Sequence, residues 1–169
     1  MTARQSNLLG ALVLAVGDRL RDVTTAEARR GGQTPAALAV LAQQEGLGIE
    51  GLRQQLNLSQ PATVRLVNAL VAANLAVRRE GADHRSVEVR LTRAGRARAD
   101  AVLSGRRAVL DEVLRPLRAA DRAALEALLD QVLGALTTDR IEAEVICRLC
   151  DLGACELSRC PVECALGDV

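Results

Sequence analysis

The chain has 169 residues, a length that suits one domain or one domain with an appended module. Hydrophobic residues make up 49% of it, but Phe, Trp and Tyr are absent, so the core must be built from Leu, Val, Ala and Ile. The formal net charge is +1, which does not by itself indicate a nucleic-acid partner. No apolar run reaches the roughly 18 residues that a membrane span needs, and the short apolar start lacks a signal-peptidase site. We therefore expect no membrane partner and a cytoplasmic protein, in which cysteines are reduced thiols or metal ligands.

Residues 8–44 predict two helices separated by a loop. The first helix ends near residue 22 and is indicated by apolar residues at helical spacing: Leu8, Leu9, Leu12, Val13, Val16 and Leu20. Residues 24–33 are polar and turn-rich, which is typical of a loop, with a helical extension ahead of the loop as the alternative. Thr34 is then expected to cap a second helix, with Pro35 in its first turn, and this helix continues over residues 36–44.

The next stretch predicts a helix-turn-helix. A short helix over residues 49–57 ends near Asn57, and Ser59 then provides an N-cap ahead of Gln60 and Pro61. The helix that follows has one apolar face, formed by Leu66, Val67, Leu70 and Val71. Thr63, Arg65 and Asn68 fall largely off that face and are expected to remain free for another surface.

After Asn74 the period changes from helical to alternating. Val87, Val89 and Leu91 alternate with polar residues, and residues 80–83 are typical of a hairpin turn. Residues 78–98 hold seven arginines against three carboxylates, so positive charge concentrates on this hairpin. A helix-turn-helix followed by an arginine-bearing hairpin predicts a winged helix-turn-helix, a unit that reads double-stranded DNA.

The expected geometry assigns roles to the polar residues of this unit. The first turns of the second helix enter the major groove, where Gln can pair with adenine and Arg with guanine. The candidates there are Ser59, Gln60, Thr63 and Arg65. Arg85 at the hairpin tip is the expected minor-groove probe, fixed by an ion pair with Asp83. The expected phosphate contacts are Arg78, Arg79 and Arg90.

Four short motifs of this region resemble the MarR family of bacterial transcription regulators. They are Ser59-Gln60-Pro61, Leu75-Ala76-Val77-Arg78-Arg79, Asp83-His84-Arg85 and Leu91-Thr92-Arg93-Ala94-Gly95. Asn74 stands where glycine is usual and His84 where arginine is common; Asn also accepts left-handed backbone angles. The resemblance covers roughly residues 5–140. It implies a mostly α fold with a small β-hairpin wing, a two-fold homodimer, and a small-molecule effector bound between the DNA-binding and dimerisation regions.

Two further helices are expected after the hairpin. Thr92 caps a helix from Arg93 to about residue 114, Pro116 breaks it, and Asp121 caps the next one. The last helix is rich in leucine, which is typical either of ordinary core or of an intersubunit bundle made with the N-terminal helix. The resemblance favours the bundle. The expected organisation is a dimerisation helix and loop (1–33), the winged unit (34–92), dimerisation helices (93–140) and a cysteine-rich region (141–169).

The C-terminal region carries five cysteines. Four have the spacing C-x2-C-x4-C-x4-C, which is that of a zinc knuckle with cysteine in place of histidine: Cys147, Cys150, Cys155 and Cys160. Cys164 is a substitute ligand, a disulfide partner or a spare thiol. Zinc is the first hypothesis, an iron–sulfur cluster the second, and metal-free redox-active thiols the third. Arg148 and Arg159 are expected to favour thiolates here.

Together these patterns predict a DNA-binding transcription regulator, a repressor in the first instance, that acts as a homodimer and is not an enzyme. Its cysteine-ligated metal is expected to be structural or to sense metal or redox state through the dimer helix that precedes it. One alternative is a small iron–sulfur electron-transfer protein, which reversible redox chemistry without DNA binding would favour. The other is a metal-dependent interaction adapter, which would leave the arginine-bearing hairpin unexplained.

Overall fold

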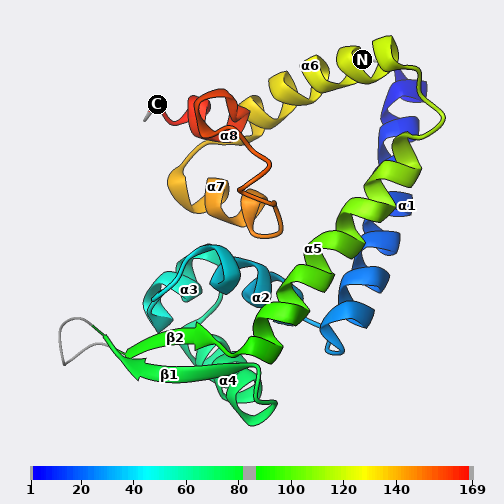
Figure 1. The fold of residues 1–169 in the computed structure, drawn as a ribbon. Coiled ribbons are helices and arrows are strands. Elements are labelled where there is room, and N and C mark those ends of the chain that lie inside the picture. Colours follow the sequence, from blue (N-terminus) through cyan, green and yellow to red (C-terminus); the bar gives the residue numbers. More distant parts are fainter. Residues whose placement is uncertain (1, 82–86, 168–169) are drawn as a thin grey trace.

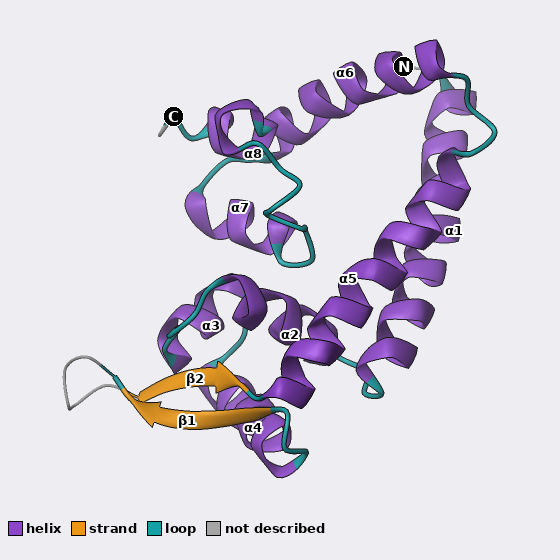
Figure 2. Cartoon of the chain, in the orientation of Figure 1, coloured by secondary structure: helices purple, strands orange, loops and turns teal. Residues whose placement is uncertain are grey.

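A computed structural model describes residues 2–81 and 87–167 of the chain; the predicted wing-tip residues Asp83, His84 and Arg85 lie outside these ranges. The fold is mostly α with one small antiparallel hairpin (Figure 2). Its elements are α1 (Ala3–Ala28), α2 (Thr34–Gln43), α3 (Ile49–Gln55), α4 (Gln60–Ala72), β1 (Ala76–Glu80), β2 (Val87–Leu91), α5 (Arg93–Leu114), α6 (Ala119–Leu136), α7 (Arg140–Cys147), the 3-10 turn η1 (Leu157–Arg159) and α8 (Pro161–Ala165).

The long helices α1 and α5 lie side by side and form a stalk that extends away from α2, α3, α4 and the hairpin, with α6 at its far end (Figure 1). Thr2 caps α1 by accepting a hydrogen bond from the Gln5 amide at 3.2 Å. The helix runs past its predicted end near residue 22 and stops at Ala28. The polar residues beyond that point stay helical because they pack inward: Thr24 is buried, and its hydroxyl donates to the Leu20 carbonyl at 2.7 Å.

Residues 34–92, which we call the head, surround the buried helix α2. Every α2 residue from Thr34 to Leu41 is buried, and α1, α3, α5 and β2 all pack against this helix. Thr34 was expected to be its N-cap, but Gln33 occupies that position without a capping hydrogen bond, and Thr34 lies inside the first turn. The largest fully buried side chains of this core are aliphatic: Leu38, Leu41, Leu52, Val67, Leu70, Val89 and Val102.

The hairpin pairs Ala76 with Leu91 and Glu80 with Val87. Val89 is fully buried against the head and Leu91 is half-buried, whereas Val87 at the outer end is 45% exposed, so only the inner part follows the expected alternation. The Val89 amide also donates to the Leu47 carbonyl at 3.0 Å. The segment before α3 therefore touches the sheet, a short pairing that the sequence pattern does not reveal.

The junction between hairpin and stalk explains the Leu91–Gly95 motif. Thr92 caps α5: its hydroxyl accepts from the Gly95 amide at 3.0 Å and donates to the Asn74 carbonyl at 2.7 Å. A Cβ atom on Gly95 would stand 1.9 Å from the Leu75 carbonyl oxygen, so only glycine lets α5 approach this closely. Asn74 adopts a φ of 56°, the left-handed conformation expected for a residue in place of glycine.

Residues 140–167, which we call the tail, fold back from the end of α6 toward the head (Figure 1). Helix α6 begins at Ala119 with Arg118 as its N-cap, so Asp121, the expected cap, lies inside the helix and pairs with Arg118 at 2.8 Å. In the tail, α7 packs against α3 and α8 against α6. None of the helices in the described ranges is long and apolar enough to span a membrane.

Candidate nucleic-acid interface and cysteine cluster

The outer face of α4 carries the predicted major-groove residues. Ser59, Gln60 and Arg65 are exposed, and Asn68 continues the same face two turns after the start of the helix. Ser59 holds the N-cap position, but its hydroxyl makes no capping hydrogen bond to a described residue, so it is available to another partner. Arg65 makes no hydrogen bond or ion pair with any residue of the described ranges. An open helix N-terminus and an unpaired guanidinium can both receive phosphate or base edges.

Thr63 is a correction to the predicted interface. Its side chain is fully buried beneath α4, and its hydroxyl donates back to the Ser59 carbonyl at 3.1 Å. It therefore cannot reach DNA in this conformation and instead supports the first turn of the helix. The sequence pattern placed it on the free face because a small polar residue does not reveal whether its hydroxyl is satisfied internally.

The arginines of the hairpin lie next to α4. Arg78 and Arg79 on β1 and Arg90 on β2 are all exposed. The Arg78 guanidinium donates to the Asn68 side-chain oxygen at 2.6 Å and so links the hairpin to the outer face of α4. Arg90 pairs with Glu88 at 2.8 Å, which offsets part of its charge. Asp83 and Arg85, the predicted tip pair, fall outside the described residues.

Solved structures of known function share this architecture. MarR from Escherichia coli superposes with a TM-score of 0.59 at 23% identity, over 74% of this chain and 96% of that one. A mutant of MepR from Staphylococcus aureus, bound to an oligodeoxyribonucleotide, gives 0.60 at 20% identity, over 78% and 97%. The fold is that of the MarR regulators. CouR from Rhodococcus jostii RHA1, bound to p-coumaroyl-CoA, gives 0.55 at 18% identity, over 74% and 88%. No family model and no curated protein matches the chain.

Within this MarR-like fold, the helices outside the head expose large apolar side chains. On α6 no residue is buried, and on α1 residues 3–15 are all exposed. The exposed set comprises Leu8, Leu9, Leu12, Val13 and Leu14 on α1 and Leu128, Leu129, Val132 and Leu136 on α6, each between 48% and 68% exposed. Within one chain α6 is therefore not ordinary core, contrary to one of the two interpretations of its leucine pattern.

The four cysteines of the predicted metal motif line one cavity of about 240 Å³. Cys147 ends α7, Cys150 and Cys155 lie in the following loop, and Cys160 precedes α8, where it is 9% exposed. All five cysteines are free thiols. Cys164 is exposed, donates to the Ser158 carbonyl at 3.6 Å and does not line this cavity. The described side chains are not already arranged as a metal centre of three or more His, Cys, Asp or Glu groups.

The cluster thiols influence one another's ionisation. A hydrogen bond from Cys147, helped by the positive charge of Arg106, lowers the pKa of Cys150 to about 6, while burial and Asp151 oppose that shift. The same hydrogen bond, with burial, raises the pKa of Cys147 well above its usual range. Burial chiefly raises the pKa of Cys155. The pair Cys147 and Cys150 thus loses its first proton readily and its second with difficulty.

The positive charge at the cluster comes from a residue that sequence reasoning missed. Arg148 and Arg159 were expected to supply it, but Arg148 donates to the Val145 carbonyl and Arg159 is directed to Glu156 at 3.6 Å. Arg106, at mid-length of α5, lines the cavity instead. It is some forty residues from the first cysteine in the chain, so only the return of the tail alongside the stalk brings it there.

A larger hollow of about 700 Å³ lies between α1, the loop that follows it and the tail. Arg106 and Arg148 both border it, together with Thr24, Gln33 and Leu149. The chain has no aromatic residue, so a ligand here would find guanidinium groups, hydroxyls and aliphatic carbon but no ring to stack on.

Proposed function

We propose that this protein is a sequence-specific DNA-binding transcription regulator that acts as a homodimer. The observation that carries the proposal is the joint exposure of the α4 face and of the hairpin arginines beside it. Gln60 and Arg65 are suited to base edges in the major groove, and Arg79 to a phosphate. The MepR complex with an oligodeoxyribonucleotide shows that a protein of this fold binds DNA.

The second copy covers the apolar faces of α1 and α6. Nine large aliphatic side chains exposed on two helices form far more than the scattered apolar residues of an ordinary surface. Each of them contributes roughly 1.5–3 kcal/mol when it moves from full exposure to full burial, so their joint burial supports a stable dimer. In such a two-fold dimer we expect the two α4 helices to lie about 34 Å apart, the spacing of successive major grooves on one side of a duplex.

The regulator acts as a repressor, since a dimer that occupies two successive grooves excludes other proteins from the same stretch of DNA. The 700 Å³ hollow between stalk and tail is the proposed site of a small-molecule effector. With Arg106 and Arg148 on its wall, it is suited to an anionic ligand. An effector bound there contacts α1, α2 and the tail together and can therefore change how the head sits on the stalk.

The test starts from a randomised double-stranded DNA library, because no operator is given by the structure. Repeated selection on the full chain is expected to enrich a duplex with an inverted repeat. Sedimentation should give a dimer in solution and one dimer per enriched duplex. Failure to enrich any sequence would reject the proposed function, and a monomer that binds one half-site would reject the dimer.

Variants of the selected complex separate base reading from phosphate contact. Arg65→Ala should lose about 1–3 kcal/mol of discrimination at the base pair it reads, whereas Arg79→Ala should weaken all sequences alike and lower the salt slope by about 1. Arg107→Ala, which removes an exposed arginine from α5, is the matched control. If Arg107→Ala weakens binding as much as Arg65→Ala, the α4 face is not the interface.

A further inference from the structure

The strongest unassigned feature is the convergence of four thiols from separate segments on one cavity. The turn from α7 into the loop brings Cys147 and Cys150 together, and the start of α8 returns Cys160 beside Cys155. All four thiols line the same cavity wall, and the Cys150 amide donates to the Cys147 carbonyl at 2.8 Å, which closes the turn between the first two. Such packing of four thiols has no catalytic or structural use in the proposed DNA interface, which lies on α4 and the hairpin.

We propose that Cys147, Cys150, Cys155 and Cys160 together bind one zinc ion, and that this zinc site fastens the tail to the head. Four sulfur ligands suit tetrahedral zinc at about 2.3 Å per bond in a closed, structural site. The thiols have to draw together around the ion from their positions on the cavity wall. Each binds as thiolate and gives up its proton to solvent, which leaves the occupied site negatively charged. Arg106 on the same wall offsets part of that charge.

The tail needs such a site because it has little core of its own. Its buried hydrophobic residues, among those described, are Ala143, Cys160 and Val162. The loop between α7 and α8 contains only one short 3-10 turn. A segment of this size gains its folding free energy from metal rather than from packing, as small zinc modules do.

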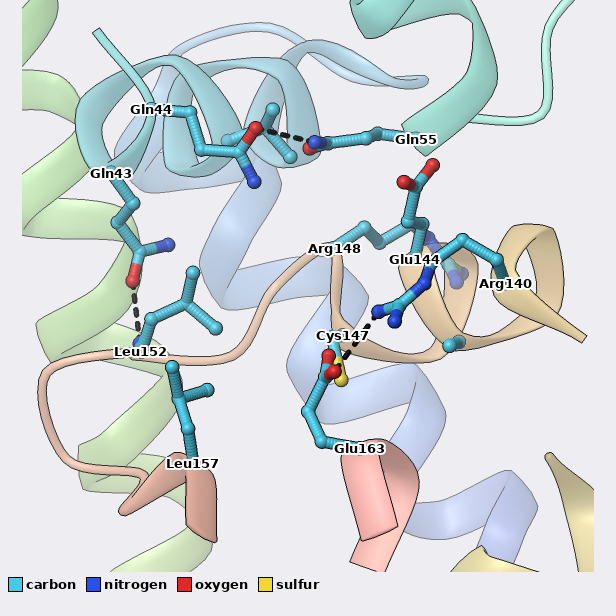
Figure 3. Close-up of a pocket in the computed structure, with 12 residues that line it drawn as sticks. Gln43, Gln44, Gln55, Arg140, Glu144, Cys147, Arg148, Leu152, Leu157 and Glu163 are labelled. Atoms are coloured by element: carbon cyan, nitrogen blue, oxygen red, sulfur yellow. Dashed lines mark hydrogen bonds and ion pairs between the residues drawn. The ribbon is translucent and has the colours of Figure 1, made fainter. Parts of the chain in front are cut away.

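The fastening itself is visible in the contacts of Gln43, the last residue of α2. Its side-chain amide donates to the Cys150 carbonyl at 3.0 Å. Its side-chain oxygen accepts from the Leu152 amide at 2.5 Å (Figure 3). One head side chain thus holds the backbone on both sides of Asp151, directly after a proposed ligand. Leu149, between two proposed ligands, packs against the main core of the head.

The contact between tail and head continues toward α3. A cavity of about 270 Å³ separates α2 and α3 from α7 and α8, and Cys147 lines it as well as the thiol cavity (Figure 3). On one wall Gln55 of α3 donates to Gln44, and on the other Arg140 pairs with Glu163 at 2.9 Å. Zinc at the four thiols therefore holds in place a segment, the tail, that contacts α2, α3 and α6. The tail thus lies between the DNA-binding head and the proposed dimer helices.

The first test is metal content of the full chain purified without oxygen or added metal. We expect one zinc per chain and, after exchange, the intense visible bands of cobalt in a tetrahedral thiolate site. Cys150→Ser and Cys160→Ser should abolish both, whereas Cys164→Ser should bind zinc as the unaltered chain does. Iron with inorganic sulfide, no bound metal, or equal loss in Cys164→Ser would overturn the site. The metal content of the unaltered chain shows whether zinc binds even if a cysteine variant fails to fold.

The second test addresses the fastening and uses hydrogen exchange of the Leu152 amide. Zinc should slow that exchange by at least tenfold in the unaltered chain, because the amide can open only when the loop leaves Gln43. In Gln43→Ala the zinc content should persist while the protection is lost. Equal exchange with and without zinc would show that the site does not hold the tail against the head. Neither test uses DNA, so both stand apart from the proposed function.

Discussion

The head and the tail are held together in opposite ways. In the head, one helix is buried over eight consecutive residues and four other elements pack around it, so aliphatic contacts determine its shape. The tail consists of α7, η1, α8 and their loops, with three buried hydrophobic residues and a cavity lined by thiols. The difference teaches that a chain without aromatic residues can still build a firm core where helices cross, but needs another source of stability where they do not.

The largest expected effect is on the free energy of unfolding, when one buried side chain is shortened in the head and, separately, one in the tail. Leu38→Ala removes a fully buried leucine from the head and should lower the free energy of unfolding by roughly 2–5 kcal/mol, because the surrounding helices cannot close the space. Val162→Ala in the tail should leave the main thermal transition in place. Circular dichroism against temperature measures both. If Val162→Ala lowers the main transition as far as Leu38→Ala does, the two regions unfold as one unit and the comparison fails.

A middle-sized effect is expected on DNA affinity, and it rests on both the zinc site and the proposed function. If the tail steadies the head, chelating zinc should weaken binding to the selected duplex by a factor of roughly 5–150, the usual range of coupling between two sites. Titration of a labelled duplex at fixed salt measures it.

The matched variant is Gln43→Ala, in which zinc-loaded and zinc-free protein should bind the duplex equally. Because such coupling is reciprocal, the duplex should tighten zinc binding by the same factor in the unaltered chain. A zinc dependence that survives in Gln43→Ala would mean that the coupling runs through another contact.

The smallest effect distinguishes two helix caps within the head. Thr92 makes hydrogen bonds to Gly95 and Asn74, so Thr92→Ala should cost about 1 kcal/mol. Ser59 makes no capping hydrogen bond, and Ser59→Ala should change stability by less than about 0.5 kcal/mol while it weakens DNA binding. Chemical denaturation and duplex titration separate the two effects. Equal destabilisation by both changes would assign Ser59 a purely structural role.

Local patterns predicted the head well because its signals are short-range. The period of the apolar residues places α4 and β2, and Thr92 predicts the start of α5 to the residue. Asn74 adopts the backbone angle expected for its position. Caps were less predictable: Thr34 and Asp121 both lie one or more residues inside their helices, because a polar residue near a helix start does not fix which residue begins it.

Features that depend on distant parts of the chain were missed. The cysteine spacing indicated a cluster, but not that Arg106 borders it or that Gln43 holds its loop. The tail was expected to act through the dimer helix before it, whereas in the structure it also contacts α2 and α3. Thr63 was misplaced for a related reason, since its burial depends on how α4 settles on the rest of the head. The spacing of residues along the chain does not indicate which distant segments come into contact in the fold.

Cys164, the thiol that stands apart from the other four, offers a way to watch the tail directly. Once zinc holds the cluster thiols, Cys164 is the exposed sulfur left for alkylation, so a maleimide dye attaches at one defined point. The chain contains no tryptophan or tyrosine, so no intrinsic emission competes with that dye. The fluorescence polarisation of the dye then falls when the C-terminal end of the tail detaches from the rest of the protein.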